Sequence, residues 1–194
     1  MFTGIIEELG ILKDISKTDS NLTLTVQSAL SAELKIDQSL SHNGVCLTIT
    51  SIIQNTYKVT AIAETIKKTT IGHWKLNELL NLERCLTFNG RLDGHMVQGH
   101  VDTVGKCIKV TNLSGSWQYV IEIPEKFAPL IIEKGSISLN GISLTIFDIT
   151  NTSFTVAIIP YTYEHTNMKA LVEGNFVNIE FDVVGKYVQR IKNL

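Results

Sequence analysis

The chain has 194 residues and a net charge of −2, with 44% hydrophobic and 19% charged residues. This composition is typical of a globular protein of one or two domains. No basic stripe and no long apolar run occurs, so neither nucleic acid nor a membrane is an expected partner. The start at Met1 lacks the pattern of a signal peptide. Three cysteines without framework spacing, Cys46, Cys85 and Cys107, indicate reduced thiols and a cytoplasmic protein.

The predicted elements are mostly strands. Residues 21–26, 46–50 and 57–62 alternate polar and apolar side chains, and the segments 117–123, 143–147 and 154–159 do the same in the second half. Turn residues lie at 54–56 and 150–152. Short strands about ten residues apart predict an all-β protein. About six strands per half would close into a small barrel, which removes exposed edges.

An internal duplication relates the two halves. Residues 39–49 (SLSHNGVCLTI) return 97 positions later as residues 136–146 (SISLNGISLTI), and the match runs without a gap to Asn-Leu-Glu at 81–83 and Asn-Ile-Glu at 178–180. A looser echo relates residues 3–10 to 98–105. We therefore expect two similar domains, 1–93 and 94–184, each long enough for its own core. The glycine-rich stretch 88–94 is the expected boundary.

Helical segments are expected to be few. Residues 28–34 and 126–132 can each form a turn or two. The last segment places apolar residues at helical spacing, and residues 185–194 lie beyond the second repeat, so we expect a C-terminal helix that contacts another subunit. The alternative is that this helix packs back on the second domain. The apolar positions are Val183, Val184, Tyr187, Val188, Ile191 and Leu194.

The two copies differ where chemistry is expected. Cys46 is matched by Ser143, and His100 is matched by Ile5. The Asn-Gly pairs at 43–44 and 140–141 predict tight turns. Cys46 then begins a strand, where it is either a small buried apolar residue or a site thiol. His100 has a side chain suited to proton transfer near neutral pH, and its alternative is a structural or solvent-facing role.

Two further hypotheses concern ligands. Zinc bound by His42, Cys46, His95 and His100 is conceivable, but their spacing is not a recognised one. His95 and His100 also face opposite sides of a strand, which disfavours a shared metal. Pro160 ends a strand, and we expect a loop there whose polar groups hold a polar heterocycle with a polyol chain. Phosphate-binding glycine loops and a serine elbow are lacking, which disfavours nucleotide-dependent and serine hydrolase functions.

Several motifs carry a resemblance along the whole chain. They are MFTGIIE at 1–7, SHNGVCLT at 41–48, NLER at 81–84, GHMVQGHVD at 94–102, NGISLT at 140–145, Ile179-Glu180 with Asp182, and Gly185-Lys186-Tyr187. In this order they resemble the riboflavin synthase and lumazine protein family.

The resemblance implies two tandem six-stranded Greek-key barrels, short helices and a C-terminal helix through which a homotrimer forms. It implies sites between the N-terminal barrel of one subunit and the C-terminal barrel of its neighbour. Each site would bind two molecules of 6,7-dimethyl-8-ribityllumazine and transfer a four-carbon unit between them. The products would be riboflavin and 5-amino-6-ribitylaminouracil, in the last step of riboflavin biosynthesis. The resemblance implies no cofactor and no metal.

The resemblance also implies site residues. Catalytic polar groups would be Ser39, Cys46 and His100. The first pocket would be lined by Gly4, Ile5, Ile6, Cys46, Leu47, Thr48, Thr60, Ala61, Ile62, Ala63, Glu64, Thr65, Gly99, His100 and Val101. The second would be lined by Lys134, Ser143, Leu144, Thr145, Ile159, Pro160, Tyr161, Thr162, Tyr163 and Glu164.

Some questions stay open at the level of sequence. Asn140 stands where the family often has Asp, and Tyr161 stands where Glu or His is common. The nucleophile is Cys46, Ser39 or water, and either barrel can hold the donor. The trimer can act alone or join lumazine synthase. The alternative function is a non-catalytic, antenna-type lumazine or flavin carrier. A flavin-dependent reductase would need a nicotinamide domain, and no segment of the chain corresponds to one.

Overall fold

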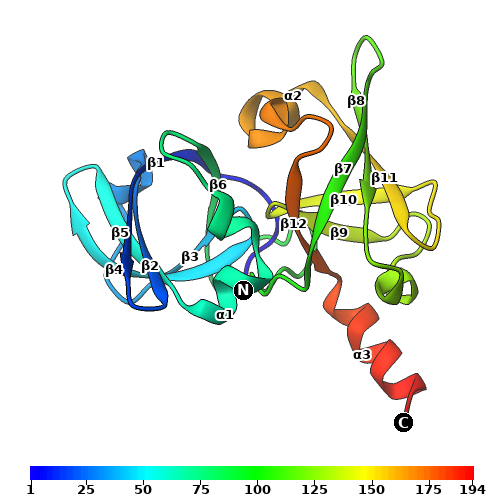
Figure 1. Cartoon of the computed structure of the whole chain (residues 1–194), viewed down its shortest axis with the longest axis horizontal. Helices are drawn as coiled ribbons and strands as arrows, with labels where there is room; N and C mark the ends of the chain where they lie inside the picture. Colours follow the sequence, from blue (N-terminus) through cyan, green and yellow to red (C-terminus); the bar gives the residue numbers. More distant parts are fainter.

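The computed structural model describes residues 1–194 and contains two closed antiparallel barrels side by side (Figure 1). The first barrel has the strand order β1-β2-β5-β4-β3-β6, and the second has the same cyclic order of equivalent strands, β7-β8-β11-β10-β9-β12. The expected all-β class with two six-stranded barrels is confirmed. The strands are β1 (Glu8–Thr18), β2 (Asn21–Gln27), β3 (Ser39–His42), β4 (Val45–Ile53), β5 (Thr56–Ala61), β6 (Leu79–Arg84), β7 (Thr103–Asn112), β8 (Trp117–Glu122), β9 (Ser136–Leu139), β10 (Ile142–Phe147), β11 (Ser153–Ile158) and β12 (Phe176–Phe181).

The Asn-Gly pairs form the predicted tight turns. Asn43 and Gly44 have φ of 47° and 79°, and Asn140 and Gly141 have φ of 46° and 82°. Positive φ at both central residues defines the two-residue hairpin that matches strand twist. These turns connect β3 to β4 and β9 to β10. They therefore fix the register that places Cys46 and Ser143 at equivalent positions of the two barrels.

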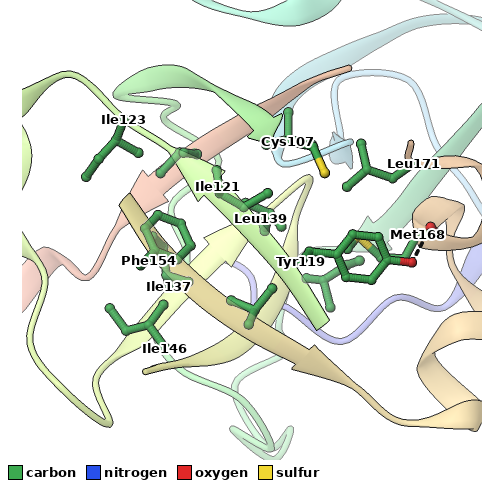
Figure 2. Packing of buried hydrophobic residues seen from close by; sticks show 14 of the residues in the cluster. Cys107, Tyr119, Ile121, Ile123, Ile137, Leu139, Ile146, Phe154, Met168 and Leu171 are labelled. Carbon is green, nitrogen blue, oxygen red and sulfur yellow. Dashed lines mark hydrogen bonds between the residues drawn. The ribbon is translucent and has the colours of Figure 1, made fainter. Parts of the chain in front are cut away.

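Each barrel has its own apolar core, because the inward-facing positions of its strands are aliphatic or aromatic. A single tyrosine is fully buried near the centre of each core. Tyr119 donates its hydroxyl hydrogen to the carbonyl of Met168 at 3.0 Å in the second core (Figure 2), and the Tyr57 hydroxyl lies 2.8 Å from Nε2 of His42 in the first. These bonds satisfy the phenol groups and allow both rings to be buried.

Short helices connect the strands. The segment expected as a loop after β11 is instead a helix, and that expectation was wrong. Pro160 ends the strand as expected, but it then occupies the first helical turn, where the missing N–H costs nothing. The helices are η1 (Ala29–Ala32), α1 (Ala63–Lys68), η2 (Thr70–His73), η3 (Glu125–Leu130), α2 (Pro160–His165), η4 (Asn167–Ala170) and α3 (Val183–Lys192).

The C-terminal helix α3 projects away from the second barrel (Figure 1). Its apolar side chains are exposed, with Tyr187 and Ile191 each at 69%. The alternative that this face packs back on the second barrel is therefore wrong. The helix is attached at its first turn, where Lys186 forms an ion pair with Asp102 at 2.6 Å. None of the helices has the length and apolar character needed to span a bilayer.

Candidate functional site

Two segments outside the barrels cross between them. The N-terminal residues pair with the linker in an antiparallel bridge, in which Phe2 and Val97 exchange hydrogen bonds of 2.7 and 3.1 Å. Beyond this bridge the segments diverge. Gly99 accepts a hydrogen bond from the backbone N–H of Cys46 at 2.9 Å, and Gly4 accepts one from that of Ser143 at 2.8 Å. The segment that contains Gly99 is therefore hydrogen-bonded to the β3–β4 hairpin of the first barrel. The segment that contains Gly4 is hydrogen-bonded to the β9–β10 hairpin of the second.

Glycine is required at both contact points. Gly4 and Gly99 have φ of +81° and +78°, and an added Cβ would lie 2.6 Å from the Cβ of Ser143 or Cys46, respectively. Such a separation is a clash, and positive φ is strained for other residues. The chain can approach these hairpins closely only because both positions lack a side chain.

The crossing corrects one part of the expected site. Gly4 and Ile6 were expected beside Cys46, but Gly4 contacts Ser143 and Ile6 packs against the core of the second barrel. Val101, in contrast, packs against the core of the first barrel. The looser repeat could not reveal this, because contacts that cross between domains leave no local periodicity. Ile5 and His100 are exposed on these segments.

Cys46 is half-buried in β4, beside the hydroxyl of Ser39. Burial raises the pKa of its thiol above the usual value, while the hydrogen bond with Ser39 lowers it less. The protonated thiol therefore dominates at neutral pH, and it is a weaker nucleophile than a thiolate. Cys46 is therefore not a fully buried apolar residue, and its thiol is partly accessible on the first barrel.

The first-barrel face combines these residues with the end of β5 and helix α1. Ile62 is 56% exposed, and Ala63 and Glu64 are exposed beside it. Glu64 forms an exposed ion pair with Lys68 at 2.8 Å, one turn along α1. Leu47 and Ala61 are instead buried within the barrel, while Thr48 faces solvent and Thr60 and Thr65 are half-buried. The face is thus an open surface that combines apolar side chains such as Ile62 with hydroxyl, carboxylate and imidazole groups.

The second-barrel face has different chemistry at equivalent positions. The hydroxyl of Ser143 lies 2.7 Å from Nδ1 of His95, whose pKa is lowered by burial. Tyr163 stacks on Trp117 with ring centroids 3.7 Å apart, and Tyr161 is 69% exposed. This face also carries exposed or half-exposed residues from β10, from α2 and the residue before it, and from the turn before β9. They are Lys134, Leu144, Thr145, Ile159, Pro160, Thr162 and Glu164.

Neither face is enclosed within one chain. A cavity of about 540 Å³ lies beside β3 and β6, and one of about 650 Å³ lies in the groove between the barrels. Neither is lined by Cys46, His100 or Ser143, although Ser39 and Ile5 line the first. The two faces are therefore identified by the chemistry of their side chains and not by these two cavities.

The residues of the zinc hypothesis have separate partners. His42 is fully buried between Tyr57 and the carbonyl of Leu40, and burial lowers its pKa to about 4. His95 faces Ser143 in the second barrel, whereas His100 lies beside the hairpin of Cys46 in the first. The four side chains do not converge on one point.

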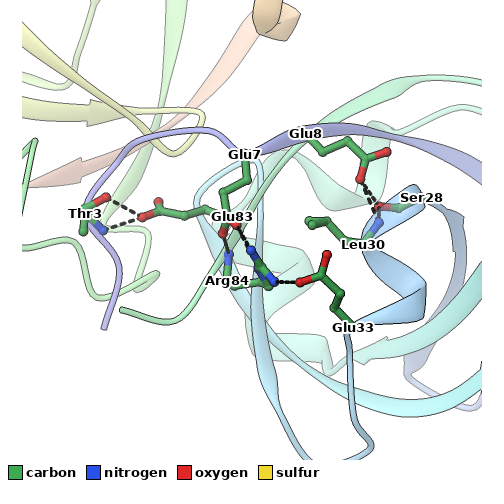
Figure 3. A network of polar contacts seen from close by, with 8 residues as sticks. All are labelled: Thr3, Glu7, Glu8, Ser28, Leu30, Glu33, Glu83 and Arg84. Atoms are coloured by element: carbon green, nitrogen blue, oxygen red, sulfur yellow. Dashed lines mark hydrogen bonds and ion pairs between the residues drawn. The ribbon is translucent and has the colours of Figure 1, made fainter. Parts of the chain in front are cut away.

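Sequence reasoning missed two buried carboxylates, Glu83 on β6 and Glu180 on β12. Both accept hydrogen bonds from backbone N–H groups of the crossing segments, and Figure 3 shows Glu83 reaching Thr3. The sequence feature that could have revealed them is the Asn-x-Glu triplet that ends both repeats.

Asn140, where the family often has Asp, is buried in the turn and accepts a hydrogen bond from the N–H of Asn178 at 2.8 Å.

Comparison with known proteins agrees with this architecture. The lumazine binding domain family matches the chain twice, over residues 3–85 and 98–182. The chain is therefore a protein with two tandem lumazine binding domains, one in each barrel. The riboflavin synthase of Actinobacillus pleuropneumoniae is 41% identical over 191 residues, which cover 98% of this chain and 89% of that protein. That of Bacillus subtilis is 36% identical over the same length and shares. The chain belongs to the riboflavin synthase family.

Solved structures agree on the fold. The crystal structure of LumP complexed with riboflavin superposes with a TM-score of 0.88 at 24% identity, covering 93% of this chain and 99% of that one. LumP complexed with 6,7-dimethyl-8-(1'-D-ribityl) lumazine gives 0.86 at 23% identity, with the same coverage. At this identity the likeness shows the fold alone.

Proposed function

We propose that the chain is a transferase that converts two molecules of 6,7-dimethyl-8-ribityllumazine into riboflavin and 5-amino-6-ribitylaminouracil. The observation that carries the proposal is the asymmetry of two equivalent faces. Cys46 and His100 on one face are matched by Ser143 and Ile5 on the other, while Ser39 has a serine, Ser136, at its equivalent position. A reaction between two identical molecules needs two similar binding faces, of which one must treat its ligand differently.

The proposed chemistry begins with proton removal from the 7-methyl group of one lumazine. The resulting anion delocalises into the ring, so a base of moderate strength suffices, and we assign this role to the exposed imidazole of His100. The group that adds to the other ring is Cys46, Ser39 or water, and the side chains of Cys46 and Ser39 lie next to each other on this face.

Orientation supplies the rest of the proposed acceleration. Well-oriented reactants reach effective molarities of about 10⁵–10⁸ M. Since both faces are open on one chain, we propose that the first-barrel face of one protomer closes on the second-barrel face of another. The exposed apolar side of α3 supports a trimer formed through residues 185–194, with 1–93 and 94–184 as the two binding units. We also propose lumazine synthase as a protein with which this trimer could form a larger complex.

Three unpaired cysteines support a reducing, cytosolic setting for this enzyme. The deciding experiment mixes the purified full chain with 6,7-dimethyl-8-ribityllumazine in buffer containing a metal chelator and no cofactor. Riboflavin should form together with an equal amount of the pyrimidine product. The absence of riboflavin at concentrations at which the substrate binds would contradict the proposal.

The second candidate is a non-catalytic carrier. The likeness to LumP keeps this candidate in view, because that protein was crystallised with riboflavin and with the lumazine. The three polar residues Ser39, Cys46 and His100 favour catalysis, since a carrier has no use for a base beside its ligand. Tight, fluorescent binding without turnover in the same assay would favour the carrier.

A further inference from the structure

We propose that Glu180, a residue of the second barrel, is a positioning residue that holds His100 at the first-barrel face. The inference rests on the proposed function, because His100 is the assigned base. It adds a residue that contacts no substrate and acts through the backbone of the crossing segment.

The carboxylate of Glu180 binds three consecutive N–H groups. Its Oε1 accepts from Gln98 at 2.7 Å, and its Oε2 accepts from Gly99 at 2.8 Å and from His100 at 2.9 Å. The side chain is 2% exposed, so water does not compete for these bonds. Hydrogen bonds to an ionised acceptor are stronger than neutral ones. The backbone at His100 is therefore held at a fixed position relative to β12.

A second carboxylate holds the other end of the same segment. Oδ2 of Asp102 accepts from the N–H of Phe181 at 2.9 Å and lies 2.6 Å from Nζ of Lys186. Between these two carboxylates, the carbonyl of Gly99 accepts the N–H of Cys46 at 2.9 Å. Residues 98–102 are thus fixed to the second barrel on one side and to the first-barrel hairpin on the other. This arrangement fixes the position of the backbone from which the side chain of His100 extends.

The same device occurs in the other half, without a base. Glu83 is 3% exposed and accepts from the N–H and hydroxyl of Thr3 at 2.6 and 2.7 Å (Figure 3). It also accepts from the N–H of Gly4 at 3.0 Å. Glu7 accepts from the N–H of Arg84 at 2.6 Å, as Asp102 does from Phe181. Ile5 stands at the position of His100, and its N–H donates to the hydroxyl of Thr3 at 3.3 Å and not to Glu83. The chain therefore offers an equivalent carboxylate whose loss should disturb the opposite face.

The test compares Glu180→Gln with two matched variants in the full chain. An amide directs an NH₂ group at one of the backbone donors, so at least one N–H loses its partner. We expect kcat to fall about tenfold and KM to change less than about threefold. Amide hydrogen exchange at Gln98, Gly99 and His100 should become faster. Glu83→Gln should speed exchange at Thr3 and Gly4 and raise KM more than it lowers kcat.

The remote control is Glu8→Gln. Glu8 accepts from the hydroxyl of Ser28 and from the N–H groups of Ala29 and Leu30, which is the same kind of clamp at η1. It should leave kcat and KM within about twofold of the parent, since surface-side losses act on stability. If Glu180→Gln folds and changes kcat no more than Glu8→Gln does, the positioning role is refuted.

Two results would require a different measurement: a Glu180→Gln variant that does not fold, and a parent protein without activity. If Glu180→Gln does not fold, Asp102→Asn and Lys186→Met test the other end of the segment; a fall in kcat of about threefold or more supports the inference, and unchanged kcat overturns it. If the parent protein makes no riboflavin, the proposed function fails, and the clamp is then judged by exchange alone. Faster exchange at His100 in Glu180→Gln supports the clamp, and unchanged exchange rejects it.

Discussion

Asn81 and Asn178, which occupy equivalent positions on β6 and β12, cross-link the two barrels through the same pair of turns. Nδ2 of Asn81 donates to the carbonyl of Asn140 at 2.9 Å, and Nδ2 of Asn178 donates to the carbonyl of Asn43 at 2.9 Å. Each amide is almost fully buried. The tight turns therefore serve as contact points between the barrels, and the arrangement of the two faces depends on them.

Replacing Asn178 with alanine should destabilise the protein. The change leaves the carbonyl of Asn43 and the N–H of Thr70, which Oδ1 of Asn178 binds at 2.8 Å, buried without partners. We expect a loss of about 2 to 4 kcal/mol in the free energy of unfolding. Urea denaturation measures it. Asn151→Ala, on an exposed turn, is the control and should stay within about 0.5 kcal/mol of the parent. Equal midpoints for both variants would contradict the cross-link.

The buried imidazole of His42 should make stability depend on pH. Its pKa is about 4 in the folded protein, against 6.5 for an ordinary histidine. Between these values the unfolded chain binds a proton that the folded protein does not, so stability falls as pH falls from 6.5 to 4. The full difference is about 3 kcal/mol. Unfolding free energies across this range should show the slope in the parent and a smaller slope in His42→Gln.

Other groups titrate in the same range, which is why the difference between variants is the measured quantity. Burial raises the pKa of Glu83 and of Glu180, and their contribution has the opposite sign, since stability from them grows as pH falls. His73→Ala, at an exposed position, should keep the slope of the parent. A His42→Gln slope equal to that of the parent would remove His42 from this account.

Replacing His100 with alanine should reduce turnover more than binding. Loss of a general base lowers kcat by about 10²–10⁴-fold. The dissociation constant of the lumazine, measured by fluorescence, should change much less. The apolar side chains of Ile62 and Val101, against which we expect the lumazine ring to pack, remain in the variant. Unchanged turnover would exclude His100 from proton transfer.

Cys46→Ser should retain part of the activity. Because burial keeps the thiol protonated, a hydroxyl in its place preserves a hydrogen-bonding group of similar size beside Ser39. We expect kcat to remain within about tenfold of the parent. Stopped-flow absorbance of the lumazine can follow the reaction. An activity near zero in a folded Cys46→Ser protein would show that the thiol is the obligatory nucleophile.

A charge on the exposed side of α3 should prevent assembly. Tyr187→Glu or Ile191→Glu places a carboxylate on a face that is solvent-exposed in one chain. If three helices bury this face together, light scattering should give the mass of one chain and turnover should be lost, because no face is completed by a neighbour. Gln189→Glu is a control on the same helix. Assembled, active Tyr187→Glu protein would refute the role of α3. Deletion of residues 185–194 should likewise give smaller, inactive species.

Local patterns decided most of the fold. The alternation in residues 21–26 and 117–123 predicted strands, Asn-Gly predicted the turns at 43–44 and 140–141, and the spacing of Tyr187 and Ile191 predicted α3. These features depend on neighbours within a few residues, so the chain order reveals them. The repeat added that two similar barrels follow one another. The residue types at Cys46 and His100 indicated candidate catalytic side chains, one in each half of the chain.

Only the tertiary structure decided which barrel each crossing segment contacts. Gly4 and Gly99 look alike in sequence, yet one contacts Ser143 and the other Cys46, each across the boundary between barrels. The roles of Glu83 and Glu180 depend on the same crossing. The backbone hydrogen bonds that cross between the barrels, Cys46 to Gly99 and Ser143 to Gly4, join residues 53 and 139 positions apart and obey no period. Their physical basis is the requirement that buried backbone N–H groups find acceptors, which is met only once the two barrels lie together.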